Sequence, residues 1–143
     1  MKREIKFRAW DKQRHHMLDV EELAYNLRGE LVSIYGFGRD FSNDPDALLG
    51  EEPDLDRAVL MEYTGLHDKN GRSIYEGDII VTHPKSKYEA PKSGVVQFGD
   101  SCPSFIYKVK DGREYDIWSS NVFRTYEVIG NIFENPELLE EEQ

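Results

Sequence analysis

Residues 63–82 read YTGLHDKNGRSIYEGDIIVT and carry the strongest information about the fold. Asn70-Gly71 lies between two apolar segments, and this dipeptide favours a tight hairpin because both residues tolerate a positive φ. Glu76-Gly77-Asp78 predicts a second turn, and residues 79–82 (IIVT) then predict a short buried strand. Two turns and three extended segments in so short a span indicate an antiparallel β fold.

The same pattern continues toward the C-terminus. Asp111-Gly112 predicts a second tight hairpin, Gly130 a bulge or bend, and Asn135-Pro136 the end of the sheet. Residues 83–93 contain two prolines and three lysines and predict an exposed loop. The predicted strands in this half are 94–98, 105–110, 113–118 and 122–132.

Toward the N-terminus, residues 4–10 (EIKFRAW) alternate in polarity, which predicts a strand with Lys6, Arg8 and Trp10 on one face. A return strand over 15–20 would complete a hairpin with a basic outer face. Residues 21–28 (EELAYNLR) predict either a short helix, with Leu23 and Leu27 four apart, or part of a continuous meander. Further strands are expected at 30–37 and 57–64, with a short helix at 46–49.

The spacing of strands and turns is typical of barrels and sandwiches. We predict a mainly β fold of the β-rich α+β class, with an N-terminal hairpin or meander lobe over residues 1–71. This lobe includes an acidic loop at 38–56. Residues 72–136 are expected to form an SH3-like β-barrel, because Gly77-Asp78 followed by residues 94–98 is similar to the first strands of that fold. Residues 137–143 would form an acidic tail.

The charge of the chain is uneven. Its 143 residues carry a formal net charge of −10, and residues 40–56 hold seven carboxylates without a lysine or arginine. Such negative charge disfavours non-specific attraction to DNA or anionic lipid. Residues 1–16 are instead basic, with six basic residues against two acidic ones. The candidate binding surface is this basic hairpin, represented by Lys6, Arg8, Trp10, Lys12 and Arg14.

No pattern of catalytic, cofactor-binding or metal-binding residues stands out. His15-His16 lies near Asp11 and Asp19, but adjacent strand residues point to opposite faces, and spacing indicates no further ligand. The other candidates are His67 beside Asp68, His83, the single cysteine Cys102, and the aspartates 40, 44, 46, 54 and 56. None has a partner at a spacing typical of a triad or a calcium loop. We therefore expect a protein that is not an enzyme, binds no cofactor and has no metal site.

The single cysteine suits a reducing compartment, and the chain starts without an apolar signal region. No apolar run approaches the roughly 18 residues that a membrane span needs. These features predict a location in the cytoplasm and no membrane partner.

Three segments taken together resemble the YopX family. They are residues 2–11 (KREIKFRAWD), residues 63–80 (YTGLHDKNG followed by IYEGDII) and residues 127–139 (EVIGNIFENPELL). The resemblance implies a protein encoded by a bacteriophage or prophage, a β-rich fold and a bacterial host cytoplasm. It supplies no catalytic residues.

These observations predict a non-enzymatic accessory protein that binds a macromolecule, a host or phage protein in preference to nucleic acid. Self-association as a homo-oligomer is also expected, with the basic residues 1–16 of one copy meeting the acidic residues 40–56 of another. Two alternatives stay open. One is nucleic-acid binding through the basic hairpin, and the other is an acidic surface that imitates DNA and inhibits a host protein.

Overall fold

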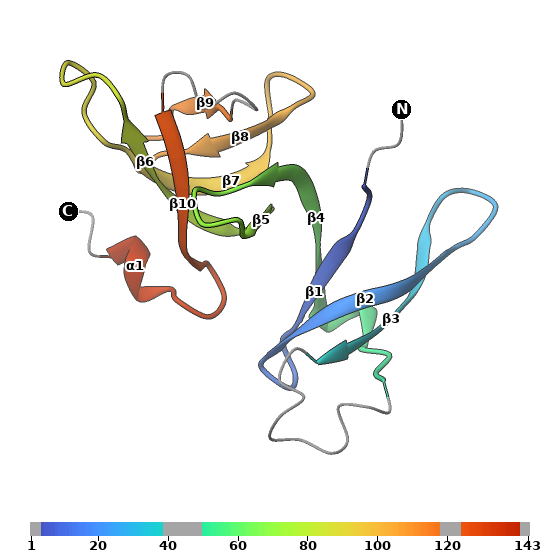
Figure 1. Ribbon diagram of the computed structural model, residues 1–143. Coiled ribbons are helices and arrows are strands. Elements are labelled where there is room, and N and C mark those ends of the chain that lie inside the picture. Colours follow the sequence, from blue (N-terminus) through green and yellow to red (C-terminus); the bar gives the residue numbers. More distant parts are fainter. Residues whose placement is uncertain (1–3, 39–49, 118–123, 141–143) are drawn as a thin grey trace. The chain divides into compact units, whose positions relative to one another are not determined.

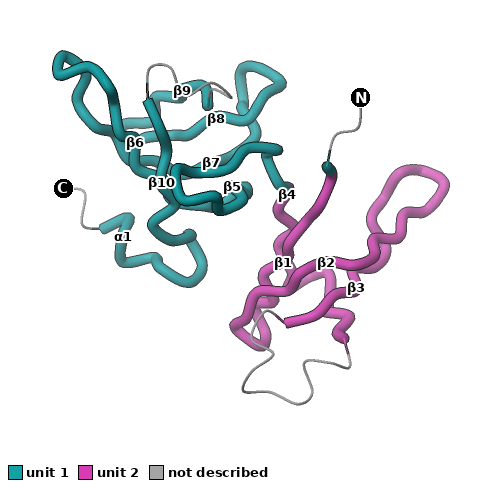
Figure 2. The backbone as a smooth tube through the Cα atoms, in the orientation of Figure 1, with its two compact units in different colours: residues 1–4, 63–143 teal, residues 5–62 magenta. Residues whose placement is uncertain are grey.

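The computed structural model describes residues 4–38, 50–117 and 124–140. The chain divides into two compact units, an N-terminal unit over Ile5–Glu62 and a C-terminal unit over Tyr63–Gln143 to which Met1–Glu4 also belong (Figure 2). The boundary expected after residue 71 therefore falls inside the C-terminal unit. Both units are built from antiparallel strands, which confirms the predicted mainly β class (Figure 1).

Four strands form the sheet of the N-terminal unit, in the order β3-β2-β1-β4. They are β1 (Phe7–Asp11), β2 (His16–Tyr25), β3 (Leu31–Gly38) and the first half of β4 (Ala58–His67), which a 3-10 turn, η2 (Leu55–Arg57), precedes. Strand β1 is central, with Ala9 directly opposite Leu18 on one side and Leu60 on the other. Ala9 and Leu18 are completely buried, so this row forms the core of the sheet.

The predicted helix over residues 21–28 is wrong, and the meander alternative is confirmed. Strand β2 continues to Tyr25, with Leu23 opposite Ile34 and Ala24 opposite Ser33 in β3. Pairing with β3 satisfies the backbone groups that a helix would have satisfied internally, and one leucine pair four residues apart is weak support for a helix. The helix expected at 46–49 lies outside the described residues.

The C-terminal unit contains a five-stranded antiparallel sheet in the order β10-β6-β7-β8-β9. Its elements are β5 (Ser73–Tyr75), which pairs with the second half of β4, then β6 (Asp78–Pro84), β7 (Ser93–Phe98), β8 (Phe105–Lys108), β9 (Glu114–Asp116), β10 (Arg124–Asn131) and α1 (Glu137–Glu140). The buried core consists of Ile74, Ile80, Val96, Tyr107 and Tyr126. Between the described strands, no pairing closes β9 on β10, so the SH3-like barrel stays a prediction.

The register of β10 against β6 shifts between Val128 and Gly130, which confirms the predicted irregularity at Gly130. Beyond β10, the tail forms the single helical turn α1. Over the described ranges, no helix is long and apolar enough to cross a membrane.

Three hairpins use the same three-residue turn. In the turn at 68–72, the amide of Asp68 donates to the carbonyl of Arg72 at 2.8 Å, and the amide of Gly71 donates back to Asp68 at 3.0 Å. Gly71 alone takes a positive φ, of 85°, so the tight two-residue Asn-Gly turn expected here is replaced by a longer one. The same two hydrogen bonds and the same glycine conformation recur in the turns at 26–30 and 109–113.

Candidate functional site

The predicted binding surface on the N-terminal hairpin is not a continuous exposed face. Arg8 is 3% exposed and Trp10 is 6% exposed. Because β1 is paired on both edges and covered on both faces, alternation along it does not separate a solvated face from a buried one. Lys12 and Arg14 are exposed in the turn, and Lys6 is partly exposed. The structure therefore removes Arg8 and Trp10 from the candidate surface.

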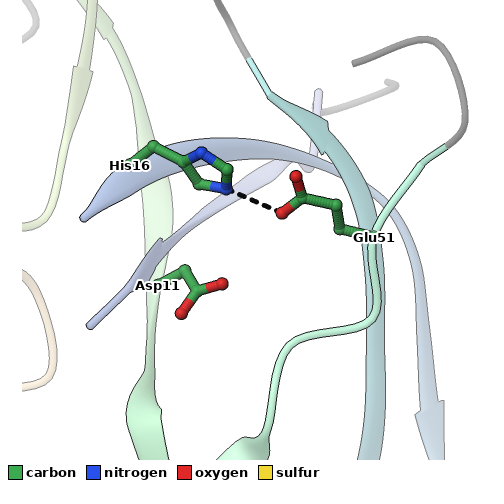
Figure 3. Close-up of side chains that lie close together, drawn as sticks. All are labelled: Asp11, His16 and Glu51. Carbon is green, nitrogen blue, oxygen red and sulfur yellow. Dashed lines mark hydrogen bonds and ion pairs between the residues drawn. The ribbon is translucent and has the colours of Figure 1, made fainter. Parts of the chain in front are cut away.

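A polar cluster lies at the turn between β1 and β2, where Asp11, His16 and Glu51 come together (Figure 3). One ligand-type atom from each of the three side chains lies within 4.8 Å of the other two. His16 Nε2 is 2.7 Å from Glu51 Oε2. The same carboxylate oxygen receives an ion pair from Arg14 Nη1 at 3.1 Å. Two sequence-distant segments, the β1–β2 hairpin and the segment around Glu51, thus meet at one carboxylate.

The hairpin register places two members of the cluster. Asp11 and His16 are the last directly opposed pair before the turn, so their side chains share a face of the sheet. Asp11 is buried, and its Oδ1 accepts the backbone N–H groups of Gln13 at 2.9 Å and Arg14 at 3.3 Å. These bonds fix the carboxylate at the mouth of the turn.

Two glycines bring in the third member. Glu51 exchanges both backbone hydrogen bonds with Gly36 of β3, at 2.7 and 3.0 Å. A Cβ at position 36 would collide with the carbonyl oxygen of Asp19, so only glycine lets the strands approach this closely. Gly50 takes a φ of 73° and lies against the Tyr35 side chain. A Cβ at position 50 would collide with the Tyr35 hydroxyl. Glu51 is therefore positioned by close contacts that a side chain at position 36 or 50 would break.

Two of the three members of this cluster, Asp11 and His16, were named from the sequence. The expectation that His15 and His16 diverge is confirmed, because His15 stands in the turn at a φ of 54° and packs edge-on against Trp10, with ring centroids 6.2 Å apart. Glu51 was missed as a partner, since it was one carboxylate among seven in a segment expected to be a loop. No spacing rule links it to Asp11. Of that acidic segment, residues 39–49 lie outside the described residues.

The remaining histidines and the cysteine are apart from this cluster. His67 lies 3.3 Å from the Tyr63 hydroxyl, and His83 Nε2 lies 2.8 Å from Glu127 Oε1. Cys102 is exposed, with its sulfur 3.2 Å from the Ser104 hydroxyl. Among the described residues, neither histidine forms a hydrogen bond with Cys102 or Ser104, so these side chains form no pair of nucleophile and base.

Asp68 holds the turn between β4 and β5 against β10. Its Oδ1 accepts the N–H groups of Asn70 and Arg72, and its Oδ2 accepts the N–H of Val128 at 3.0 Å. Burial raises the pKa of this carboxyl, but the three amide donors and the Arg72 guanidinium outweigh that effect, so the pKa of Asp68 lies below its usual value. The residue is a structural anchor inside the C-terminal unit.

A hollow of about 340 Å³ in the C-terminal unit is lined by Tyr107, Tyr115, Lys92, Arg124 and Glu89 among others. Arg124 and Glu89 form a bidentate ion pair, with N–O distances of 2.7 and 2.8 Å. Hydrogen bonding to Glu89 raises the pKa of Arg124, and burial raises the pKa of Tyr107 to about 12. The Arg124 guanidinium and the Glu89 carboxylate of the hollow are thus already engaged with each other.

The distal half of the β2–β3 hairpin, residues 21–33, projects beyond the sheet, and we call it the hairpin arm (Figure 1). Strand β1 pairs with β2 only over residues 16–19, so the arm is a two-stranded ribbon. It exposes Tyr25 by 53% and Val32 by 49%, and Leu27 at its tip is fully exposed. Its charged residues are three glutamates, at 21, 22 and 30, and one arginine, at 28.

Two antiparallel β units, a positioned polar cluster at a turn and an apolar, acidic arm define a small two-unit β protein. The chain belongs to the YopX family, because the family model described as YopX protein matches residues 6–140. No curated protein matches the chain.

Two crystal structures of similar proteins extend this comparison. Protein EF1440 from Enterococcus faecalis is 31% identical, with a TM-score of 0.64, and the match covers 96% of this chain and 99% of that protein. Protein yopX from Bacillus subtilis is 23% identical, with a TM-score of 0.60 and coverage of 94% and 95%. The second likeness supports the fold alone.

Proposed function

We propose that this chain is a phage- or prophage-encoded accessory protein that acts without catalysis, by binding a basic host or phage protein through its hairpin arm. The observation that carries the proposal is the exposure of Tyr25, Leu27 and Val32 on one projecting ribbon. Exposed apolar groups that gather in one place are typical of binding surfaces. An isolated two-stranded ribbon is also only marginally stable in water, so burial against a partner would stabilise it.

The chemistry of the arm favours a basic partner. Three glutamates surround the apolar groups, and the one arginine, Arg28, already lies 3.7 Å from Glu30. The net charge of −10 would attract a basic protein over long range and repel nucleic acid. The charge therefore favours a protein partner, whether or not that partner binds DNA itself.

The turn at the tip supports a preformed binding element. Asn26 Oδ1 accepts the backbone N–H groups of Arg28 at 2.9 Å and Glu30 at 3.0 Å. Gly29 takes a φ of 81°, which closes the turn. Little chain entropy would therefore be lost when Leu27 enters a pocket of the partner.

The proposal assigns the protein to the cytoplasm of the bacterial host. The single cysteine, Cys102, is exposed and forms no disulfide, which suits a reducing compartment. Self-association of copies stays a prediction of its own. Arg14 already pairs with Glu51 in the same chain, which engages two of the charges that such an association would use.

Affinity capture from host lysate, at low and high salt, tests the proposal when the wild-type chain is compared with the variant Tyr25→Ser/Leu27→Ser. Tyr88→Ser is the matched control, because Tyr88 is also a highly exposed aromatic but lies outside the arm. We expect the wild type and the control to retain the same basic protein, with weaker retention at high salt. The arm variant should lose it. Equal retention by the arm variant would remove the arm from the proposal.

A further inference from the structure

We propose that Asp11, His16 and Glu51 form a binding site for a divalent transition-metal ion, with Zn²⁺ as the ion to test first. The site is independent of the hairpin arm, since none of its residues belongs to residues 21–33. Two features carry the proposal. The three ligand-type atoms converge, and the buried carboxylate of Asp11 has an oxygen that remains available to a ligand.

Asp11 is only 3% exposed. Its Oδ1 accepts the two turn amides, and within the described part of the chain no group donates a hydrogen bond to its Oδ2. This oxygen is not among the buried side-chain atoms that lack a hydrogen-bond partner, so it remains accessible to solvent and an incoming cation can reach it. Figure 3 shows the Asp11 carboxylate on the same side of the strands as the His16 ring and the Glu51 carboxylate.

The spacing of the three groups suits a small cation. A metal ion holds nitrogen and oxygen ligands at about 2.0–2.2 Å, which puts neighbouring ligand atoms about 3–4 Å apart. The present atoms lie within 4.8 Å of one another, and His16 Nε2 is 2.7 Å from Glu51 Oε2. Small side-chain rotations would therefore create the coordination distances, with no change in the backbone.

The donor set selects the class of metal. Calcium and magnesium take oxygen ligands, whereas an imidazole nitrogen favours zinc, copper, iron and nickel. Two carboxylates would balance the charge of a divalent ion. Three protein ligands would leave at least one coordination position for water.

Arg14 gives the proposal a distinctive test, because its guanidinium competes with the metal for Glu51 Oε2. Its side chain is 57% exposed, so it is able to swing into solvent when an ion binds. Replacing Arg14 by glutamine should strengthen metal binding several-fold. If Glu51 serves only in ion pairing, the same change would leave zinc affinity unaltered.

Isothermal titration of the untagged full chain with ZnCl2 tests the site. The ligand variants are His16→Asn and Glu51→Gln, and their matched controls are the neighbouring changes His15→Asn and Glu52→Gln. We expect binding of one ion per chain in the wild type and in both controls. Because loss even of a supporting group costs 10–100-fold in metal affinity, each ligand variant should weaken binding by at least about 10-fold.

A thermal melt of each variant, recorded without zinc, reports whether the fold is retained. Zinc should raise the melting temperature of the wild type and leave that of Glu51→Gln nearly unchanged. The proposal would be overturned by equal zinc affinities in Glu51→Gln and Glu52→Gln, or by the absence of saturable binding in the wild type. Neither result would bear on partner capture by the arm.

Discussion

Buried aspartates in this protein act mainly as acceptors for backbone amides. Asp11 caps the turn between β1 and β2, Asp68 caps the turn between β4 and β5, and Asp78 Oδ2 accepts the amide of Tyr75 at 2.8 Å. Each carboxylate accepts hydrogen bonds from backbone amides that have no strand partner and would otherwise need water as an acceptor. At the scale of single residues, the hydrogen bonds of these carboxylates stabilise the turns.

Replacing Asp68 by asparagine should lower the free energy of unfolding by about 1–3 kcal/mol at neutral pH. The change removes a charged acceptor from the amides of Asn70, Arg72 and Val128. Denaturant unfolding measures the loss. The control is Asn70→Asp, because Asn70 lies in the same turn and is exposed.

The same carboxyl predicts a dependence of stability on pH. Because the pKa of Asp68 is lower in the folded state, its contribution is present above the unfolded value of about 3.9 and is lost as pH falls through the folded pKa. The wild type should therefore lose more stability than Asp68→Asn when the pH falls from 5 to about 2. Parallel losses in the two proteins would contradict this assignment.

Tyr107 predicts the opposite dependence at alkaline pH. Its pKa is raised to about 12 by burial, so the unfolded chain ionises first, near pH 10. Stability should fall by up to about 1.4 kcal/mol per pH unit between these values. Tyr107→Phe should show a shallower fall over the same range in denaturant titrations, and an unchanged slope would show that Tyr107 ionises normally.

At the scale of elements, glycines decide how closely strands and turns approach. Gly36→Ala should disrupt the pairing of β2 with β3 and displace Glu51, because the new methyl group would meet the Asp19 carbonyl. Overpacking of this kind costs about 1–3 kcal/mol. Gly38→Ala is the matched control, since a Cβ there meets no atom within 4 Å. Thermal melts should separate the two variants, and equal melting temperatures would contradict the close approach.

The tip of the arm gives a second prediction for an element. Gly29→Ala places a Cβ where nothing lies within 4 Å, so its only cost is the strain of a positive φ, about 1 kcal/mol. The effect should be local, with backbone NMR shifts changing in residues 26–30 and staying constant in β1. Shift changes that extend through β1 would mean that the arm is coupled to the sheet.

Most strands were predictable because glycine, asparagine and aspartate mark turns by local chemistry. Residues 63–82 and the Asp111-Gly112 hairpin follow those rules, and the structure has strands on both sides of each turn. The rules failed where a long-range contact decided the outcome. Residues 21–28 became a strand because β3 pairs with them, and Arg8 became buried because both faces of β1 are covered.

For the same reason, only two of the three members of the polar cluster were predictable. Asp11 and His16 lie five residues apart in one hairpin, whereas Glu51 arrives through a bridge to Gly36 that no local pattern encodes. The arm was also missed, since residues 21–28 were predicted to form either a short helix or part of a meander, and neither prediction singled out an exposed surface. Functional surfaces that depend on pairing register need the three-dimensional structure.

At the scale of the whole molecule, the proposed partner follows from the net charge and from the exposed surface of the hairpin arm. The chain is strongly acidic, and each compact unit buries apolar side chains of its own. The hairpin arm in addition carries exposed apolar groups beyond the sheet. A basic protein with an apolar pocket complements that surface in both respects. The account therefore depends on the arm being the part of the molecule that is buried on binding.

Amide hydrogen exchange of the full chain, with and without the protein that it captures, tests this claim most directly. The account predicts slower exchange in residues 21–33 on binding, centred on the turn at 26–30, and unchanged exchange in β6 and β7. Protection confined to other segments, with the arm exchanging as fast as in the free chain, would contradict it.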